Sequence, residues 1–165
     1  MITLPDNDVL TYIPPKNVYG ILAAPPCTDF SVSGSQYWKR KDQDGTTIKS
    51  MGVLIACLKI IGQCKPKFWA LENPVGRIRN WLGDPFLKFN PCDYGDAYTK
   101  KTYLWGVFQE LTKNPVEPVT NKGQLNKISQ PMNGNKKVGW HTEESKRLRS
   151  ITPPGFAKAF FEANQ

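Results

Sequence analysis

The sequence predicts an α/β fold in which short buried strands of a parallel sheet are joined through helices. Two short apolar runs, residues 18–23 and 68–71, each lead to a proline, which is typical of buried strands in parallel sheets. Between them, residues 46–62 carry apolar side chains at helical spacing. A strand, a helix and a second strand in this order predict that the helix packs on the sheet.

The length and the charge limit the classes of protein to consider. A chain of 165 residues is expected to form a single domain, residues 1–165, around one core. Its 22 Lys and Arg residues outnumber 14 acidic residues, and the net charge of +8 favours a polyanionic partner such as DNA. The longest apolar run, residues 53–61, is interrupted by Lys59 and is too short to span a membrane. With no basic start or apolar signal core, we expect a cytoplasmic protein without a membrane partner.

The elements before the second strand follow from local patterns. Residues 6–16 contain Pro14-Pro15 and predict a loop that leads into the first strand. Residues 31–45 are polar and mix aromatic with basic side chains, which fits either contact with a nucleic-acid backbone or a mobile surface loop. Thr46 or Thr47 is expected to cap the following helix.

After the second strand, residues 76–82 carry Arg77 and Arg79, and residues 86–89 and 103–108 predict two further strands. Residues 109–139 are rich in Asn, Lys, Pro and Gly, and we expect an irregular segment there. Residues 154–164 predict an amphipathic helix that starts at a proline.

The cysteines do not predict a metal site. They lack close Cys-x-x-Cys pairs, and His141 is the only histidine, so we expect no bound metal. Cys57, Cys64 and Cys92 are interpreted as reduced, small and buried. Cys27 differs, because Pro-Pro precedes it and a polar loop follows it, and this setting favours a reactive thiol.

Cys27 and Glu72 both follow predicted strands, where ligands of open α/β sheets bind. A thiol nucleophile beside an acid is what attack on a pyrimidine ring requires. Three stretches carry a more specific resemblance: Pro-Pro-Cys at 25–27, Phe-Trp-Ala-Leu-Glu-Asn-Pro at 68–74 and Asp-Tyr-Gly at 93–95. In this order and spacing they resemble the DNA cytosine-5 methyltransferases, and the tail around residues 149–154 is similar to small phage-type members.

The resemblance implies a Rossmann-like, doubly wound methyltransferase sheet and transfer of a methyl group from S-adenosylmethionine to cytosine C5 in DNA. It implies that Cys27 is the nucleophile and that Glu72 holds the base. A bacterial or phage-infected cell would be the setting, and a restriction-modification role is typical of such enzymes. The other residues to which it gives a substrate-binding role are Ser31, Asn73, Arg77, Lys100, Lys101 and Thr102. Arg77, Lys100 and Lys101 would also supply positive charge beside the thiol. The residues to which it gives a cofactor-binding role are Asp8, Val9, Ala24, Pro26 and Val53.

The chain departs from the family pattern in two places. Thr102 stands where the family has an Arg that contacts the base, with Lys101 as its substitute. No Phe-x-Gly-x-Gly loop, which cradles the cofactor in this family, occurs in the sequence. We therefore expect the first strand-helix unit to be missing, with truncation, a partner segment that supplies the loop, or degeneration as the explanations. Residues 109–139 stand in place of a target-recognition domain, which predicts short or relaxed DNA specificity.

Two further interpretations stay open. The chain is either an enzyme or a catalytically inactive nucleic-acid-binding remnant of the same fold. A less favoured reading is an enzyme that modifies bases with the same Cys and Glu but without a methyl donor.

Overall fold

A computed structural model describes residues 8–119, 132–133, 136–137, 143, 147 and 150–165. The chain divides into two compact units. The first holds the residues up to Lys88 together with Thr102–Phe108, and the second holds Phe89–Lys101 and the residues from Gln109 onward. The expectation of one catalytic domain over residues 1–165 stays a prediction.

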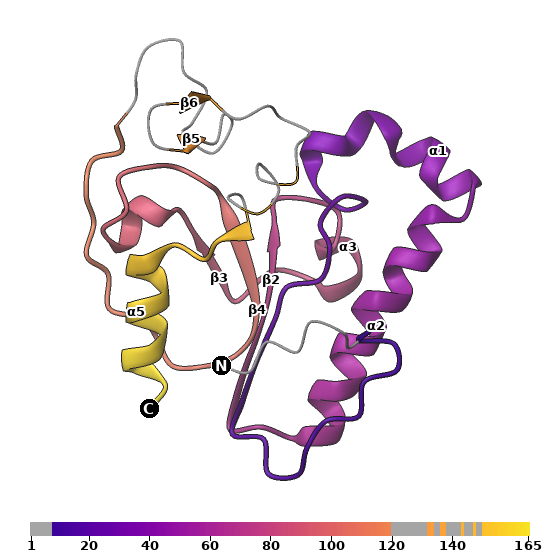
Figure 1. Cartoon of the computed structure of the whole chain (residues 1–165), viewed down its shortest axis with the longest axis horizontal. Coiled ribbons are helices and arrows are strands. Elements are labelled where there is room, and N and C mark those ends of the chain that lie inside the picture. Colours follow the sequence, from indigo (N-terminus) through magenta and orange to yellow (C-terminus); the bar gives the residue numbers. More distant parts are fainter. Residues whose placement is uncertain (1–7, 120–131, 134–135, 138–142, 144–146, 148–149) are drawn as a thin grey trace. The chain divides into compact units, whose positions relative to one another are not determined.

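A four-stranded sheet has the order β1-β2-β4-β3 (Figure 1). Its strands are β1 (Gly20–Ala23), β2 (Phe68–Pro74), β3 (Leu87–Phe89) and β4 (Thr102–Val107). β1 runs parallel to β2, with Ala23 opposite Leu71, as the sequence predicts. β2 and β4 are antiparallel, with Glu72 opposite Leu104. The fold is thus mixed α/β, and the parallel pairing is shown for β1 and β2.

β2 is longer than its apolar run predicts. The strand continues from Leu71 through Pro74, because β4 pairs with it as far as Thr102. Glu72 and Asn73 therefore lie inside a strand. The prediction that Glu72 lies where the strand opens into a loop was wrong, because cross-strand pairing extends the strand beyond the apolar residues.

The helix predicted between the two strands is α2 (Thr46–Cys64), and it already includes Thr46, one of the two residues expected to cap it. Its cap differs, because Gly45 occupies the N-cap position with φ 79° and the Asp44 carboxylate accepts a hydrogen bond from Thr46 N at 2.9 Å. α2 packs on the sheet, as the ribbon shows (Figure 1), and contributes Leu54 to the core. The rest of the buried core cluster is Phe30, Leu71, Ile78, Tyr103 and Trp105.

The segment between Ser31 and Gly45 is largely helical. The sequence had left two interpretations open for it, contact with a nucleic-acid backbone or a mobile surface loop. It contains the 3-10 helix η1 (Val32–Tyr37) and helix α1 (Trp38–Gln43). The short helix α3 (Arg79–Leu82) follows β2. In the part of the chain that the structure describes, α2 is the one helix long and apolar enough to cross a membrane. Helices in the core of a protein can have the same length and apolar composition, so these two properties do not assign α2 to a membrane.

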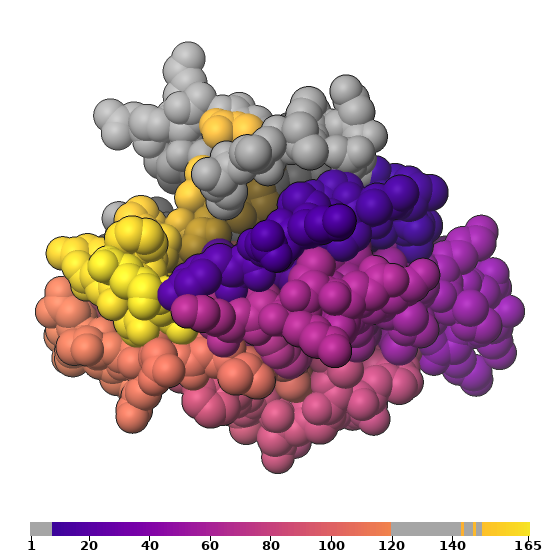
Figure 2. Space-filling model, turned by 90° about the horizontal axis from the view of Figure 1, so that it is seen from below, coloured from indigo at the N-terminus to yellow at the C-terminus, as the bar shows by residue number. Residues whose placement is uncertain are grey.

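The start of the described chain, indigo in Figure 2, lies against the surface of the first unit. Tyr19 accepts a hydrogen bond on its carbonyl from Lys67 N at 2.9 Å, and its ring packs edge-on against Phe68 at 5.7 Å. These contacts extend the pairing of β1 with β2 by one residue before Gly20.

The second unit is built around aromatic side chains. It contains η2 (Pro91–Tyr94) and helix α5 (Pro154–Ala163), close to the predicted helix over 154–164. Phe156 of α5 stacks on Phe89 at 4.2 Å and meets Tyr94 edge-on at 5.6 Å. Residues 109–119 form no helix or strand, as predicted. Further along, two short strands pair antiparallel, β5 (Met132–Asn133) and β6 (Lys136–Lys137), and the rest of 109–139 lies outside the described residues.

Candidate functional site

Cys27 lies on a tight turn just beyond the end of β1. Its carbonyl oxygen accepts hydrogen bonds from Phe30 N at 3.0 Å and from Ser31 N at 2.8 Å. Its side chain is exposed, whereas Cys57, Cys64 and Cys92 are half-buried rather than fully buried as expected. Burial raises the pKa of the Cys57 thiol, and burial together with Asp93 raises the pKa of the Cys92 thiol. The exposed Cys27 is thus the cysteine best placed to meet a substrate.

Glu72 and the Cys27 turn lie at the same edge of the sheet. β1 and β2 are parallel with Ala23 opposite Leu71, so Glu72 comes directly after the last position of β2 that pairs with β1. The chain reaches Cys27 four residues beyond β1. A side-chain bond links the two segments, since Asn73 Nδ2 donates to the Pro25 carbonyl at 2.9 Å. Glu72 itself is half-buried. A thiol and a carboxyl group thus share the carboxyl edge of two neighbouring strands, where ligands bind in open α/β sheets.

Two residues with a predicted substrate-binding role are buried. Asn73 is 0% exposed and Thr102 is 3% exposed, so neither side chain reaches the surface in this conformation. Asn73 holds the backbone ahead of Cys27, and its Oδ1 has no hydrogen-bond partner in the described part of the chain. Thr102 begins β4 opposite Pro74. Neither side chain therefore lines the surface of the site.

The other predicted substrate residues lie in different settings. Ser31 caps η1, with its hydroxyl oxygen 2.9 Å from the Ser33 hydroxyl. Lys100 is half-buried and Lys101 is exposed, and both belong to the second unit. The structure therefore assigns them no place beside Cys27.

Arg77 lies in the interior of the first unit, where the sequence predicted contact with the substrate. It is 7% exposed, and its guanidinium donates to both oxygens of the Asp42 carboxylate at 2.8 and 3.0 Å. Lys41 belongs to residues 31–45, for which the sequence left contact with nucleic acid open. It is also buried and forms an ion pair with Asp29 at 2.5 Å. The expectation of direct contact is corrected for both residues, because their charges are satisfied inside the protein.

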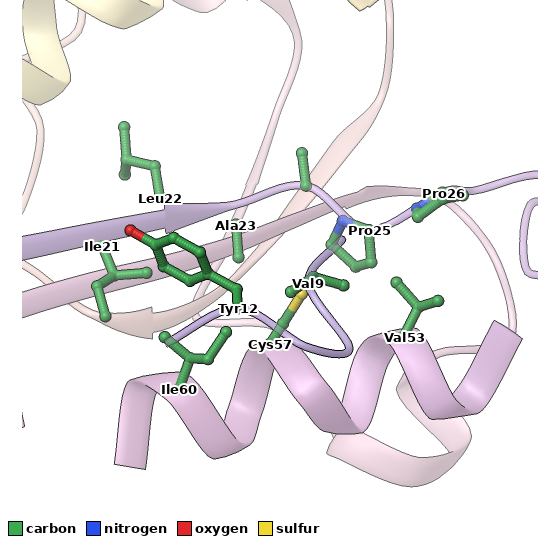
Figure 3. Close-up of a pocket in the computed structure, with 11 residues that line it drawn as sticks. Val9, Tyr12, Ile21, Leu22, Ala23, Pro25, Pro26, Val53, Cys57 and Ile60 are labelled. Carbon is green, nitrogen blue, oxygen red and sulfur yellow. The ribbon is translucent and has the colours of Figure 1, made fainter. Parts of the chain in front are cut away.

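A pocket of about 330 Å³ opens between β1 and α2 in the first unit. In Figure 3, Val53, Cys57 and Ile60 project from one face of α2 toward β1 and the segment that follows it. The residues that line the pocket are Val9, Tyr12, Ile21, Leu22, Ala23, Ala24, Pro25, Pro26, Val53, Cys57 and Ile60.

Four of the five residues with a predicted cofactor-binding role line this pocket, namely Val9, Ala24, Pro26 and Val53. The fifth, Asp8, is exposed, and its carboxylate accepts a hydrogen bond from Leu10 N at 3.0 Å. The walls are mainly apolar, and the volume lies within the range of about 300–1,000 Å³ usual for ligand pockets. The pocket therefore suits a mainly apolar group, directly beside Pro26 and the Cys27 turn.

Exposed basic side chains lie on α1, close in sequence to the Cys27 turn. Lys39 and Arg40 are exposed, and the Arg40 guanidinium lies 5.6 Å from the centre of the Tyr37 ring. Lys146 and Arg149, two further basic residues that we expect to be available for nucleic-acid contact, lie outside the described residues. Within the described ranges no group of three or more His, Cys, Asp or Glu side chains is placed to hold a metal ion.

Sequence reasoning missed the polar residues behind the Cys27 turn, which are Asp29, Asp42, Thr47 and Ser50. Asp29 follows Cys27 by two residues, and this closeness is the one signal in the sequence that relates it to the site.

Comparison with known proteins gives one family. The family model described as C-5 cytosine-specific DNA methylase matches residues 2–81, a range that contains the Cys27 turn, the pocket and Glu72. No curated protein matches the chain.

Proposed function

We propose that Cys27 is the nucleophile of methyl transfer to cytosine C5 in DNA, because residues 2–81 match the C-5 cytosine-specific DNA methylase family model. One observation carries the proposal: an exposed thiol and Glu72 lie at the same edge of two parallel strands, beside an apolar pocket. The thiol, the carboxyl group and the apolar pocket thus lie near one another within the first compact unit.

The proposed chemistry starts at cytosine C6. The Cys27 thiolate adds there and forms a C–S bond, while the Glu72 carboxyl group hydrogen-bonds ring N3. The ring then carries enamine-like electron density at C5, which becomes nucleophilic toward a methyl donor. Once C5 carries the methyl group, loss of the C5 proton to a base breaks the C–S bond, restores the aromatic ring and frees the Cys27 thiolate. Exposure of Cys27 fits this role, because a base that has left the DNA stack approaches from solvent.

S-adenosylmethionine supplies the methyl group when it is bound. We assign its adenine side to the pocket beside Pro26, where Val9, Ala24 and Val53 contribute apolar contacts. Asp8 carries a carboxylate and directly precedes Val9, which lines the pocket. The printed sequence holds no Phe-x-Gly-x-Gly loop, so we propose weak cofactor binding by this chain alone, with a partner segment completing the site.

A second candidate function is a nucleic-acid-binding protein of the same family without catalysis. The lack of a Phe-x-Gly-x-Gly loop and the net charge of +8 favour it. Titration calorimetry with S-adenosylmethionine separates the two, because the second candidate binds DNA but not the cofactor.

The test is methyl transfer from labelled S-adenosylmethionine to cytosine-containing DNA, with 5-methylcytosine measured by mass spectrometry. We expect slow transfer by the unaltered chain and none by Cys27→Ser or Glu72→Gln. Cys92→Ser is the matched control and is expected to keep the rate. DNA with 5-fluorocytosine should become attached to Cys27 in the presence of cofactor. An adduct on Cys57, Cys64 or Cys92, or unchanged transfer by Glu72→Gln, would contradict these roles.

A further inference from the structure

Every backbone carbonyl of the Cys27 turn, from Cys27 to Phe30, accepts a hydrogen bond. The Cys27 carbonyl accepts from within the turn, and the Phe30 carbonyl accepts from Arg77 N at 2.8 Å. The two carbonyls between them are bound by charged side chains. Lys41 Nζ donates to the Thr28 carbonyl at 3.1 Å, and Arg77 Nε donates to the Asp29 carbonyl at 2.9 Å. The turn that carries the nucleophile is therefore tied to the protein by two cations.

Arg77 uses its whole guanidinium inside the first unit. Beyond its bonds to the Asp29 carbonyl and the Asp42 carboxylate, it donates from Nη2 to Thr47 Oγ1 at 2.7 Å. Trp38 lies 4.9 Å and Trp81 6.0 Å from the guanidinium carbon, measured to their ring centres. A planar group held by fixed acceptors and aromatic rings has little freedom to move, so it is a rigid anchor for the turn.

Lys41 holds the same turn through a second anchor. It pairs with the Asp29 carboxylate, which also accepts a hydrogen bond from the Ser50 hydroxyl of α2. Burial alone would raise the pKa of Asp29, but the hydrogen bonds from Lys41 and Ser50 and the charges of Lys41 and Arg77 outweigh it and lower the pKa. Asp29 is thus charged at neutral pH and keeps the Lys41 ammonium beside the turn.

We propose that Arg77 and Lys41 are positioning residues, which hold the Cys27 turn in the one conformation that presents the thiol at the sheet edge. The inference rests on the proposed function for its catalytic meaning, while its structural content stands on the bonds alone. It differs from a general stabilising role, because both cations bind carbonyls of the turn itself. Loss of either cation should loosen the turn before it loosens the core.

The test is amide hydrogen exchange of Arg77→Gln and Lys41→Met, followed at Phe30, Ser31 and, for the core, Leu54. We expect exchange at Phe30 and Ser31 to become about tenfold faster, the factor for one lost charge-assisted bond. Exchange at Leu54 should stay unchanged. Arg79→Gln is the matched control, since Arg79 is an exposed arginine at the start of α3 and is paired with the exposed Asp84. Arg77→Lys keeps the positive charge but loses the planar guanidinium that donates to several acceptors at once. This variant should remain folded and give an intermediate exchange rate at Phe30 and Ser31.

Unchanged exchange at Phe30 and Ser31, or an equal increase at Leu54, would overturn the proposal. Where methyl transfer is measurable, both variants should lower kcat with little change in KM for DNA. If methyl transfer is absent from the unaltered protein, the proposed function fails, while faster exchange confined to the turn still supports the two anchors.

Discussion

At the scale of single residues, Asp29 links the Cys27 turn to α1 and α2 through Lys41 and Ser50. We predict that Asp29→Asn lowers the free energy of unfolding at pH 7 by about 3 kcal/mol, because it leaves Lys41 buried without its counter-ion. The pKa of Asp29 is lowered in the folded state, so its stabilisation is complete above a pH of about 4. It is lost as the pH falls through the folded pKa.

The measurement is urea unfolding of both proteins at neutral and at acidic pH. The difference between them should narrow at acidic pH, because the carboxylate of the unaltered protein is then protonated. Asp84→Asn is the control, since Asp84 is 70% exposed in its ion pair and its loss should cost little. A constant difference across the pH range would contradict the role given to the Asp29 charge.

The sequence predicts some residues of the site better than others, and burial explains the difference. The exposure of Cys27 follows from its place in a Pro-Pro-Cys loop. The burial of Arg77 does not follow from its closeness to Glu72 and Asn73. On α1, consecutive Lys39, Arg40 and Lys41 read as one basic run, yet only Lys41 is buried, because helical rotation directs it at the Cys27 turn. Such a distinction depends on which face the helix packs, and a short helix holds too few residues to reveal it.

At the scale of elements, the segment after β2 is held close to the Cys27 turn by a glycine. A Cβ atom on Gly76 would lie 2.0 Å from the Phe30 carbonyl oxygen, and backbone bonds fix both sides of this contact. We predict that Gly76→Ala lowers the free energy of unfolding by about 1–3 kcal/mol, since the two segments must move apart. Thermal or urea unfolding measures the change.

The control for that substitution is Gly62→Ala on α2. A Cβ atom at Gly62 meets nothing within 4 Å, so alanine should stabilise the helix by about 0.5–1 kcal/mol. The free energy of unfolding is therefore expected to fall for Gly76→Ala and to rise for Gly62→Ala. Equal effects would show that the contact with Phe30 does not limit the packing.

The sequence predicts a helix or strand well where a local pattern of residues determines it. α2 was predicted to within two residues at each end, because its apolar spacing is regular over many turns. β2 was predicted too short, because Glu72 and Asn73 are polar and their strand conformation depends on pairing with β4, which lies thirty residues away in sequence. The antiparallel β2–β4 pair is likewise a long-range feature that the apolar runs alone do not reveal.

At the scale of the whole molecule, the net charge of +8 sets the expected response of DNA binding to salt. For about three phosphate contacts, affinity should fall about 40-fold as salt rises from about 50 to about 200 mM. We predict that replacing Lys39 and Arg40 together by Gln reduces the logarithmic salt slope by about 2. Fluorescence anisotropy with a labelled duplex measures it.

A double variant of Lys16 and Lys59 to Gln is the control for charge. Both side chains are exposed and lie outside α1, so the net charge falls equally while the slope should stay nearly constant. An equal fall of the slope in both double variants would show that the bulk charge, and not α1, meets the phosphates.

Trp81 has a further consequence, because it contacts both the Arg77 guanidinium and the ring of Phe30 in the Cys27 turn. Indole emission depends on neighbouring charges and on exposure to water, and Trp38 lies against the same guanidinium. The protein therefore carries its own optical reporter beside the nucleophile. Movement of the turn during an encounter with DNA can be followed in real time by stopped-flow intrinsic fluorescence, without any attached dye.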